Sequence, residues 1–443
     1  MNSRSVALEA LEAIDVRGAY ADLALPACFR RYPALEARDK RQATELVYGS
    51  VRRMNTLDWA VGLFLKGLAL SQCDAPVRAA LRLGAYQLLY MDNIPVPVAV
   101  DATLRALSAR NRRAVGLVNA VLRRIGALEG QLPYPDPDSH PLEYLALRYS
   151  HPPWMLDHMM PRLGWEEIIA WCQWNNRSPR TTLRVNRLRT STARFTELLS
   201  CEGIAWKPGR YHEQAVRLER AGRVEELPGY EDGLFQVQDE SSMLVGALLE
   251  PQPGERVLDM CAAPGGKSTH LAELMDDRGQ VWAMDIHPGR VARIRESAER
   301  LGLSSIHVIE QDARELQGAE QSFDRVLLDA PCSGLGVLAR RPDARWRRSP
   351  EDIPALAAVQ KELLAAAGRY LRPDGVLVYS VCTLTKEEGS DVIDQFVRDH
   401  PKFSVALPPM GLARFRGENG HLTLWPHRHK TDGFVMARLS KSR

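Results

Sequence analysis

Apolar residues recur at two different spacings along this 443-residue chain, and the spacing changes near the middle. Up to about residue 130 the apolar positions follow a helical repeat, as at Val6, Leu11 and Ile14, and alanine is frequent. From Phe235 onward, short apolar runs alternate with longer amphipathic stretches, which is typical of parallel strands joined by helices. The pattern predicts a helical domain followed by an α/β domain whose sheet is covered on both faces.

A proline-rich segment and the pattern that follows it indicate a further division of the chain. Four prolines fall within residues 131–141, which predicts a linker. The next segment mixes a helical stretch with strand-like runs at 181–186 and 215–218, which predicts a small α+β module. We therefore expect a multi-domain protein with an all-α domain, a linker, a small α+β module and a C-terminal α/β domain. Their expected bounds are 1–130, 131–141, 142–233 and 234–443.

The C-terminal domain has a regular order of expected elements. Helices are expected at 267–275, 288–301 and 353–371, each between apolar runs that predict strands. The last two runs, 422–425 and 434–439, have the pattern of an antiparallel pair, and we expect them at the edge of the sheet.

Composition narrows the class of protein without naming a function. Hydrophobic residues make up 45% of the chain, enough for packed cores, and a formal net charge of +3 does not by itself indicate a nucleic-acid partner. The seven cysteines are scattered and form no C-x-x-C pair, which argues against a disulfide framework or a structural zinc site. Neither a signal-peptide core nor a membrane-length apolar run is visible, so we expect a reduced, cytoplasmic protein without a metal.

A candidate reactive site lies where two apolar runs end. Residues 326–328 predict a buried strand that ends on Asp329, and the loop that follows carries Cys332. A second run, 375–381, ends on Cys382. Because ligands bind at the carboxyl ends of the strands in open α/β sheets, an acid and two thiols there indicate nucleophilic chemistry. A buried structural thiol is the alternative for either cysteine.

An earlier loop has the composition of a ligand-binding turn at a helix start. Its residues are Cys261, Ala262, Ala263, Pro264, Gly265, Gly266 and Lys267. Small residues allow the backbone to approach a ligand, and the helix N-terminus offers free N–H groups. A P-loop requires glycine where Cys261 stands, and the G-x-G-x-x-G motif is absent, so both phosphate motifs are disfavoured. Asp285 and Asp312 follow the next two strand-like runs, a pattern typical of a nucleoside cofactor lying across the sheet edge.

Three groups of arginines are candidates for RNA contact. Residues 102–128 contain six arginines and no acid, and such a one-sign cluster favours phosphate contact over a solvated face. The arginines within 177–189 suit an RNA-facing strand and an ordinary polar sheet face equally. Those within 340–348 follow the Cys332 loop, and with Trp346 they are placed for phosphate and base contacts, a solvated loop being the alternative.

The C-terminal half resembles the S-adenosylmethionine-dependent RNA cytosine-5 methyltransferases in several motifs. The matching segments are 239–242 (DESS), 261–267 (CAAPGGK), 329–334 (DAPCSG), 379–382 (YSVC) and 431–434 (TDGF). Val381 departs from the family pattern, which usually has threonine before the second cysteine. The first half resembles the NusB-like helical domain fused to the bacterial B-type branch, which acts on 16S rRNA. Together the resemblances cover nearly the whole chain.

This resemblance implies a fold, a cofactor and individual roles. It implies a Rossmann-like domain that binds S-adenosylmethionine through the 261–267 loop, Asp285, Asp312 and Asp329. It makes Cys382 the nucleophile, Cys332 the residue that assists release, and Asp329 the group that bonds the cytosine. The expected reaction is methylation of a cytosine C5 in 16S rRNA, and the B-type likeness alone implies cytosine 967. The expected partner is free rRNA or an assembly intermediate, bound by a monomer.

Other functions stay open on the sequence alone. A P-loop NTPase conflicts with Cys261. A DNA-type cytosine methyltransferase would place the nucleophile at Cys332, because that class also uses a Pro-Cys motif. An antitermination-like RNA-binding protein would fit the helical domain but leaves two strand-end thiols without a role. Another rRNA or tRNA cytosine is the alternative target.

Overall fold

The computed structural model describes residues 2–220, 222–417 and 419–443, which form two compact units. The first unit contains the chain up to Arg177 together with a short later segment, Arg341–Arg347. The second unit contains Ser178–Arg340 and Arg348–Arg443. The expected four-part division at 130, 141 and 233 stays a prediction.

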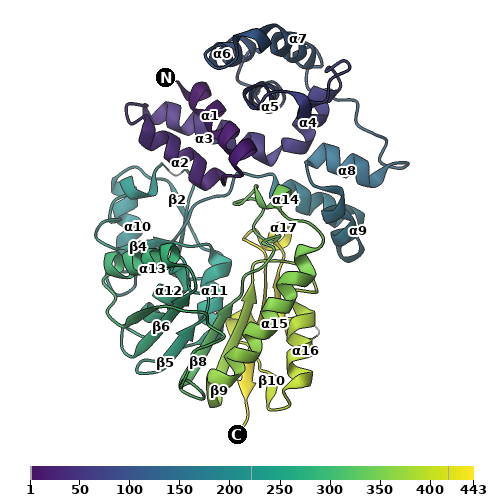
Figure 1. Ribbon diagram of the computed structural model, residues 1–443. Coiled ribbons are helices and arrows are strands. Elements are labelled where there is room, and N and C mark those ends of the chain that lie inside the picture. The colour runs from purple at the N-terminus through teal and green to yellow at the C-terminus, as the bar shows by residue number, and fades with distance from the viewer. Residues whose placement is uncertain (1, 221, 418) are drawn as a thin grey trace. The chain divides into compact units, whose positions relative to one another are not determined.

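The first unit is built from helices in the part of the chain that the structure describes (Figure 1). They are α1 (Ser3–Arg17), α2 (Ala21–Arg31), α3 (Ala37–Arg52), α4 (Met54–Gly62), α5 (Ala75–Tyr90), α6 (Val96–Ser108), α7 (Val115–Gly126), α8 (Pro141–Tyr149), α9 (Pro153–Asn175) and α14 (Ala344–Arg347). Helix α5 packs against α1, α3, α4, α6 and α7. It begins with a proline in its first turn, where the missing N–H costs nothing.

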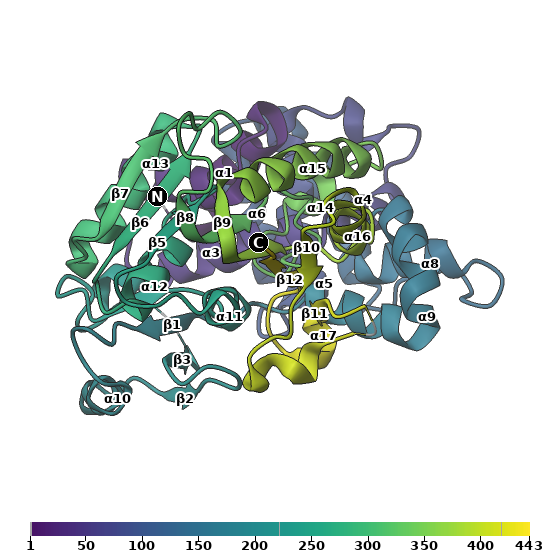
Figure 2. The ribbon, with the colours of Figure 1, turned by 90° about the horizontal axis from the view of Figure 1, so that it is seen from below.

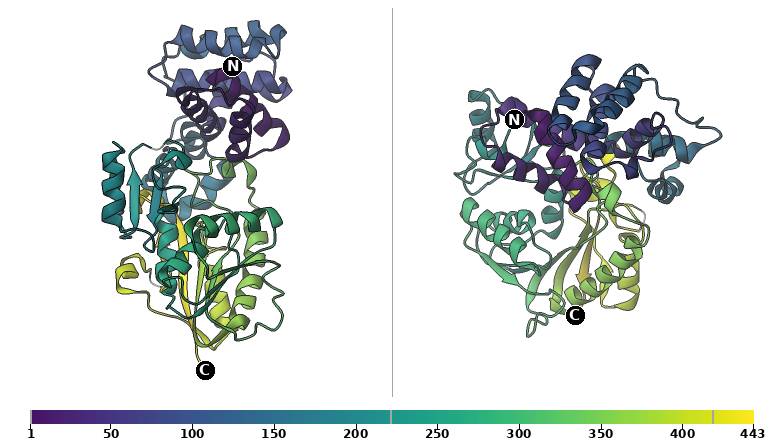
Figure 3. Two further views of the ribbon diagram at one scale, coloured as in Figure 1. Left: turned by 90° about the vertical axis from the view of Figure 1, so that its left-hand side faces the viewer. Right: turned by 45° about the horizontal axis from the view of Figure 1, so that its top comes forward.

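The second unit begins with a small antiparallel sheet in the order β2-β3-β1-β4. Its strands are β1 (Thr182–Val185), β2 (Trp206–Pro208), β3 (Ala215–Leu218) and β4 (Phe235–Val237). Helix α10 (Thr192–Cys201) lies along this sheet (Figure 3), and Phe195 from the helix packs with Leu183 and Phe235 in a common core. The two strand-like runs expected at 181–186 and 215–218 are therefore strands of one sheet.

A large mixed sheet in the order β10-β12-β9-β8-β5-β6-β7 dominates the second unit. Its parallel strands are β5 (Arg256–Asp259), β6 (Gln280–Asp285), β7 (Ile306–Glu310), β8 (Phe323–Asp329) and β9 (Leu371–Val381). The antiparallel strands are β10 (Phe403–Val405), β11 (Leu422–Leu424) and β12 (Phe434–Lys441). The alternation of apolar runs and amphipathic stretches thus produced the expected α/β domain.

Helices cover both faces of this sheet, as the alternating strand pattern requires. Helices α11 (Glu240–Leu249) and α12 (Gly266–Leu274) pack on one face, with α13 (Pro288–Leu301) beside α12. Helices α15 (Asp352–Tyr370) and α16 (Ser390–Asp399) pack on the other face (Figure 2). A short helix, α17 (Pro426–His429), follows β11.

The prediction that residues 422–425 and 434–439 form an antiparallel pair at the sheet edge is confirmed for β11, which among the described strands pairs only with β12, and is wrong for β12. The two segments do pair antiparallel, as β11 and β12. However, β12 lies inside the sheet between β9 and β10, and β10 is the strand beyond it. Strand β10 is only three residues long and lacks an extended apolar alternation, so the sequence pattern did not reveal it.

In the described residues, no helix combines the length and the apolar character that crossing a membrane requires.

Candidate active site

The carboxyl ends of three neighbouring parallel strands bring the candidate residues to one edge of the large sheet. Strand β8 ends at Asp329, which lies opposite Ser380 near the end of β9. Strand β5 ends at Asp259, beside β8 on its other side. Because all three strands run in the same direction, the loops that leave them converge.

The two candidate thiols are in direct contact. The Sγ atoms of Cys332 and Cys382 lie 3.2 Å apart, within reach of an S–H···S hydrogen bond. The pKa of the Cys332 thiol is raised well above its usual range by this hydrogen bond to Cys382, by burial and by the charge of a Cys382 thiolate. This raised pKa favours the protonated form of Cys332 beside Cys382. The expectation that Cys332 and Cys382 lie together at the strand ends is therefore confirmed. Their catalytic roles are a proposal.

Lys267 and Asp329 form an ion pair beside these thiols. The Lys267 Nζ atom lies 2.7 Å from Asp329 Oδ2, and the Ser380 hydroxyl donates to Asp329 Oδ1 at 2.7 Å. Burial alone would lower the pKa of Lys267, but the charge of Asp329 and its hydrogen bond outweigh burial and raise it, with a smaller contribution from Cys382. The Lys267 ammonium thus carries its charge close to both the carboxylate and the candidate nucleophile.

The loop between β5 and α12 has the shape that its small residues allow. Gly265 has φ 99°, in the left-handed region, and a Cβ there would stand 3.1 Å from the Ile294 backbone. A side chain at this position would be both strained and crowded. The loop therefore lies against α13, and the N-terminus of α12 is directed to the strand edge.

Four carboxylates surround this loop. The pKa of the Cys261 thiol is raised by burial first and then by the charges of Asp259, Asp329, Asp285 and Asp312. Sequence analysis had identified three of these acids, and the fourth, Asp259, is the one it missed. Asp259 ends an apolar run as Asp329 does, so the same signal would have found it.

Asp259 is fully buried, and one of its oxygens accepts a hydrogen bond from the Ser268 hydroxyl at 2.7 Å. Its other oxygen, Oδ1, has no hydrogen-bond partner among the described residues. Burial and, after it, the negative charge of Asp329 raise the pKa of Asp259 to about 7, against the lowering effect of the Ser268 hydrogen bond. A proton donor brought to this edge would satisfy the free oxygen.

Asp285 and Asp312 differ in how they are held. Asp285 is 8% exposed and accepts a hydrogen bond from the His287 backbone at 3.0 Å. Asp312 is bonded by the Arg314 guanidinium, which lowers the pKa of that carboxyl. Next to Asp285, the Ile286 side chain is 54% exposed. An exposed apolar side chain beside carboxylates fits a nucleoside, whose base has an apolar face and whose ribose has hydroxyl donors.

A buried glutamate, which sequence analysis did not identify, links the two cysteine loops. Glu388 is fully buried and accepts hydrogen bonds from the Ser333 N–H at 2.7 Å and the Thr385 hydroxyl at 2.9 Å. The hydroxyl of Ser333, the residue after Cys332, lies 2.8 Å from that of Thr383, the residue after Cys382. Glu388 therefore fixes the separation of the two thiols, and its charge also contributes to the raised pKa of Cys332.

Arg184 from β1 anchors the cofactor-loop helix and is not a surface residue. Its guanidinium is fully buried and pairs with Glu273 at 2.6 Å. It also donates to the Gly266 carbonyl at 2.7 Å and to the Thr269 hydroxyl at 3.0 Å. The hypothesis that Arg184 lines an RNA-facing strand is therefore wrong, whereas Arg187 and Arg189 are exposed.

The predicted phosphate contacts of residues 340–348 are largely wrong. Arg340 forms ion pairs with Asp239 and Asp432. Arg345 is fully buried in the first unit, and Arg347 donates there to the Ala19 carbonyl. The Trp346 indole donates to the Val51 carbonyl at 2.7 Å and packs against the helical core, so it is not free for base stacking. Charged residues in a polar segment are normally solvated. The sequence alone does not reveal that residues distant in the chain pair with Arg340 and bury Arg345.

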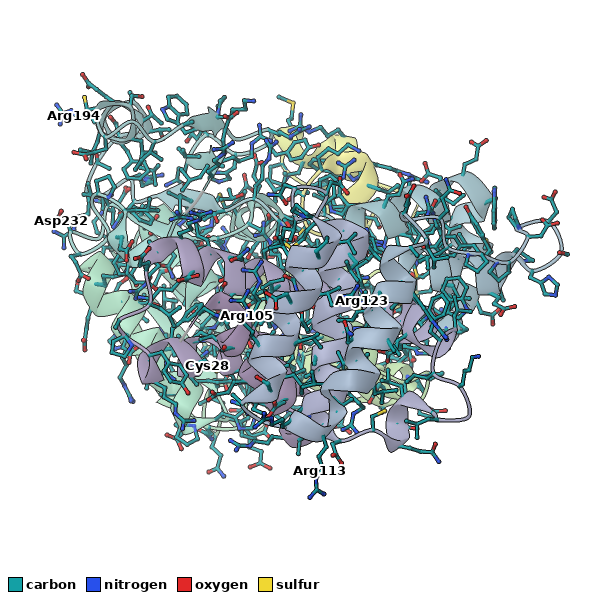
Figure 4. The ribbon with its side chains drawn as sticks, turned by 90° about the horizontal axis from the view of Figure 1, so that it is seen from above. Cys28, Arg105, Arg113, Arg123, Arg194 and Asp232 are labelled. Carbon is teal, nitrogen blue, oxygen red and sulfur yellow. The ribbon has the colours of Figure 1, made fainter. Side chains whose placement is uncertain are left out.

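The acid-free cluster in residues 102–128 is mostly exposed. Arg105, Arg112, Arg113, Arg123 and Arg124 are at the surface of the first unit, and Figure 4 shows Arg113 pointing away from α6 and α7. Arg110 differs, because Glu9 and Glu12 of α1 pair with it at 2.9 and 2.7 Å. The absence of acidic residues within 102–128 did not prevent acidic residues of another helix from pairing with an arginine of this segment.

This fold, with thiols and carboxylates at one strand edge, defines an S-adenosylmethionine-dependent RNA methyltransferase. The chain belongs to the 16S rRNA methyltransferase RsmB/F family, whose model matches residues 246–440. The model of the NusB family matches residues 1–127, and a ferredoxin-like domain model of RsmF/B-like methyltransferases matches 151–225.

Relatives of known name match over the full length. The chain is 36% identical to a probable ribosomal RNA small subunit methyltransferase B of Synechocystis, covering 100% of both sequences. It is 36% identical to the probable methyltransferase B of Bacillus subtilis, over 99% of this chain and 98% of that protein. A ribosomal RNA small subunit methyltransferase B of Escherichia coli is 35% identical over 99% of both.

Solved structures agree with this fold. The crystal structure of PH0851 is 28% identical and superposes with a TM-score of 0.84, covering 100% of this chain and 99% of that one. NSun6 from Pyrococcus horikoshii with SFG is 25% identical, with a TM-score of 0.58 over 65% of this chain and 97% of that one.

Proposed function

We propose that this protein methylates C5 of a cytosine in 16S rRNA, with Cys382 as the nucleophile. The observation that carries this proposal is the 3.2 Å contact between Cys332 Sγ and Cys382 Sγ, beside the Lys267–Asp329 ion pair. Family membership supports rRNA as the substrate, and a strand-end thiol is the nucleophile that the proposed addition to cytosine C6 requires. The curated relatives act, by name, on small-subunit rRNA.

Addition of a thiolate to the base begins the proposed reaction. Cytosine C5 is a weak nucleophile, and a thiolate that bonds to C6 pushes electron density onto C5. Cys382 suits this step because its Sγ is in hydrogen-bond contact with Cys332 Sγ and the Lys267 ammonium is close. Asp329 faces the same place and would bond the cytosine edge near N3, which stabilises the adduct.

Release of the product requires two further bond changes. After C5 has gained its methyl group, the C5 proton must pass to water or another base at the strand edge. The electrons of the C5–H bond then re-form the C5–C6 double bond as the bond between C6 and Cys382 breaks, which restores the thiolate. Cys332 is the group placed to assist this release, since its sulfur is in contact with Cys382. Glu388 holds the two loops at this separation.

The residues present fit S-adenosylmethionine, which would supply an electrophilic methyl group on a sulfonium. The 261–267 loop would hold it at the N-terminus of α12, with Asp285 and Asp312 toward the nucleoside part. The unpaired oxygen of Asp259 and the exposed Ile286 also fit a ligand with both donors and an apolar face. NSun6, a solved relative, was determined with SFG, an analogue of this cofactor.

The opposite assignment of the two cysteines would make Cys332 the nucleophile, as in DNA-type enzymes. Besides the hydrogen bond to Cys382, burial and the charge of Glu388 raise the pKa of Cys332, which disfavours its thiolate and supports Cys382 as the nucleophile.

Methyl transfer to rRNA tests the proposal. Small-subunit rRNA from a strain that lacks the modification should accept one methyl group, and mapping should place it on a cytosine, which the family likeness puts at position 967. Matched DNA should accept none. A methyl group on another base, or transfer to DNA alone, would reject the proposed reaction.

A further inference from the structure

A second candidate binding place lies entirely within the first unit. A cavity of about 420 Å³ is lined by residues that include Arg53, Tyr90, Tyr134, Arg148, Asn176 and Arg177. They come from the α3–α4 junction, the end of α5, the proline-rich segment, the end of α8 and the residues after α9. This Tyr90–Tyr134 cavity is within the range of about 300–1,000 Å³ typical of ligand pockets.

The charge of this cavity is one-sided. Three arginines and no carboxylate line it, and within the described ranges Arg53, Arg148 and Arg177 form no ion pair. Another cavity of the same unit, of about 430 Å³, differs because Glu36 and Asp39 line it together with arginines. Only the Tyr90–Tyr134 cavity of these two therefore favours an anion.

Two guanidinium groups of the cavity lie over aromatic rings. The Arg53 guanidinium lies 4.6 Å from the Tyr90 ring, and Tyr90 itself stacks on Tyr86 at 5.5 Å. The Arg148 guanidinium lies 4.9 Å from the Tyr134 ring, and Tyr134 stacks on Trp59 at 5.1 Å. Planar groups held in this way are suited to stack with the bases of single-stranded RNA.

A buried arginine supports the wall of the cavity. The Asn176 amide donates to the Tyr149 carbonyl at 2.7 Å, while its oxygen accepts from Arg345 at 2.7 Å. Arg345 is fully buried, and its other bonds go to the carbonyls of Arg52, Ser150 and Asn175. Burial lowers the pKa of Arg345, and the charges of Arg52 and Arg53 lower it further. Arg53, Arg148 and Arg177, which form no ion pair within the described ranges, would be stabilised by a bound phosphate.

We propose that the Tyr90–Tyr134 cavity binds one unpaired nucleotide of the RNA substrate. Its base stacks on a guanidinium plane, its polar edge meets Asn176, and an adjacent phosphate is bound by the arginines. A base within a duplex has no free face to enter, so the cavity selects single-stranded or loop RNA. The inference rests on the proposed function in one respect, namely that the substrate is RNA.

Binding of a fluorescent single-stranded oligonucleotide from small-subunit rRNA tests the proposal. Arg53→Ala with Arg148→Ala should weaken binding by roughly tenfold to a hundredfold, because stacking and phosphate contacts are both lost. The log–log salt slope should fall by about 0.7 per lost phosphate contact. Arg17→Ala with Arg41→Ala removes equal charge from the same unit outside the cavity and should change affinity less than threefold. Equal effects of the two pairs would overturn the proposal.

A second readout locates the base. Oligonucleotides with 4-thiouracil should photo-crosslink to peptides that contain Tyr90 or Tyr134, and the same strand in a duplex should not. Crosslinks confined to other peptides would contradict the proposal. If the alanine pair does not fold, Arg53→Lys with Arg148→Lys keeps the charge and should still lose the crosslink.

The two proposals fail in different ways. Wild-type protein that crosslinks at the cavity but transfers no methyl group would reject the proposed function alone. Normal methyl transfer with an unchanged KM for RNA in the alanine pair would reject the cavity alone.

Discussion

The contact between Cys332 and Cys382 shows how one residue sets the chemistry of its neighbour. Both thiols follow apolar strands, and in sequence nothing but family resemblance distinguishes them. In the structure the surroundings of the two thiols differ. The contact with Cys382 and the charge of Glu388 favour the protonated form of Cys332. The Lys267 ammonium lies close enough to Cys382 for the charge of a Cys382 thiolate to raise the pKa of Lys267. This asymmetry supports addition by Cys382 and release by Cys332.

Asp285 should contribute to cofactor affinity. Its carboxylate follows β6 and would accept hydrogen bonds from a ribose, and bonds that involve a charged group contribute roughly 1.5–3 kcal/mol. Asp285→Ala should therefore weaken S-adenosylmethionine binding by about tenfold to a hundredfold, as measured by titration calorimetry. Asp232→Ala, an exposed acid before β4, serves as the control. Unchanged affinity in a folded Asp285→Ala protein would remove Asp285 from the site.

Asp259 should make stability depend on pH in an unusual direction. Its pKa in the folded state is raised to about 7 from an ordinary value of 3.8, so between those values the folded state binds the extra proton. Stability from this group is present at low pH and is lost as the pH rises from about 4 to about 7. Asp259→Asn should gain stability relative to wild type over that range, on the order of 1–4 kcal/mol.

Denaturant unfolding at pH 4.5 and pH 7.5 measures this difference. Asp374→Asn, an exposed acid outside the site, should show no comparable change between the two values. A constant difference between Asp259→Asn and wild type at both pH values would contradict the raised pKa.

At the scale of elements, Glu388 joins the loops after β8 and β9 into one structure. Glu388→Ala would remove the acceptor of the Ser333 N–H and of the Thr385 hydroxyl and should destabilise the protein by roughly 1–3 kcal/mol. Glu388→Gln keeps the shape but removes a negative charge, so the pKa of Cys332 should fall. Alkylation of Cys332, followed by mass spectrometry across a pH series, should begin at lower pH in this variant.

The Asp391→Asn variant is a matched control for this experiment, since Asp391 is exposed at the start of α16 and should leave the alkylation profile unchanged. If Glu388→Gln and Asp391→Asn give the same profile, Glu388 does not act on the thiol.

Helices and strands with a strong apolar periodicity could be predicted from the sequence, whereas the buried charged residues that support the site could not. The helix over 288–301 has the expected bounds, because proline marks its start and glycine its end. The strand at 403–405 was missed because three residues are too short for a pattern. Asp329, Cys332 and Cys382 were found because each ends an apolar run.

The residues that support the site gave no such signal. Arg184, Glu388 and Arg345 are charged, and charged residues are almost never fully buried unless they are paired. Their partners come from distant parts of the chain, as Glu273 does for Arg184. Only the folded arrangement shows that these side chains are structural.

At the scale of the whole molecule, the exposed arginines of the first unit should provide general affinity for RNA. Arg112→Ala with Arg113→Ala should weaken RNA binding and lower the log–log salt slope by about 0.7 per lost contact to single strands. Cofactor affinity should stay the same. Arg110→Ala is the control, because Glu9 and Glu12 already pair with that guanidinium. A salt slope unchanged in the double variant would mean that these arginines form only a solvated face.

The central claim is that Cys382 attacks the base and Cys332 assists its release. Cys332→Ser should accumulate a covalent complex with RNA that survives denaturing electrophoresis, because elimination is slowed while addition is not. Cys382→Ser should form none and should be inactive. Substitution of a merely structural thiol would cost stability and trap nothing.

The most direct measurement is mass-spectrometric mapping of that covalent bond. Unmodified protein can be trapped on RNA that contains 5-fluorocytosine, since fluorine at C5 cannot leave as a proton does, and the Cys332→Ser complex can be mapped in the same way. The account predicts that the RNA is attached to the peptide containing Cys382 in both cases. Attachment to Cys332 in the unmodified protein would contradict it.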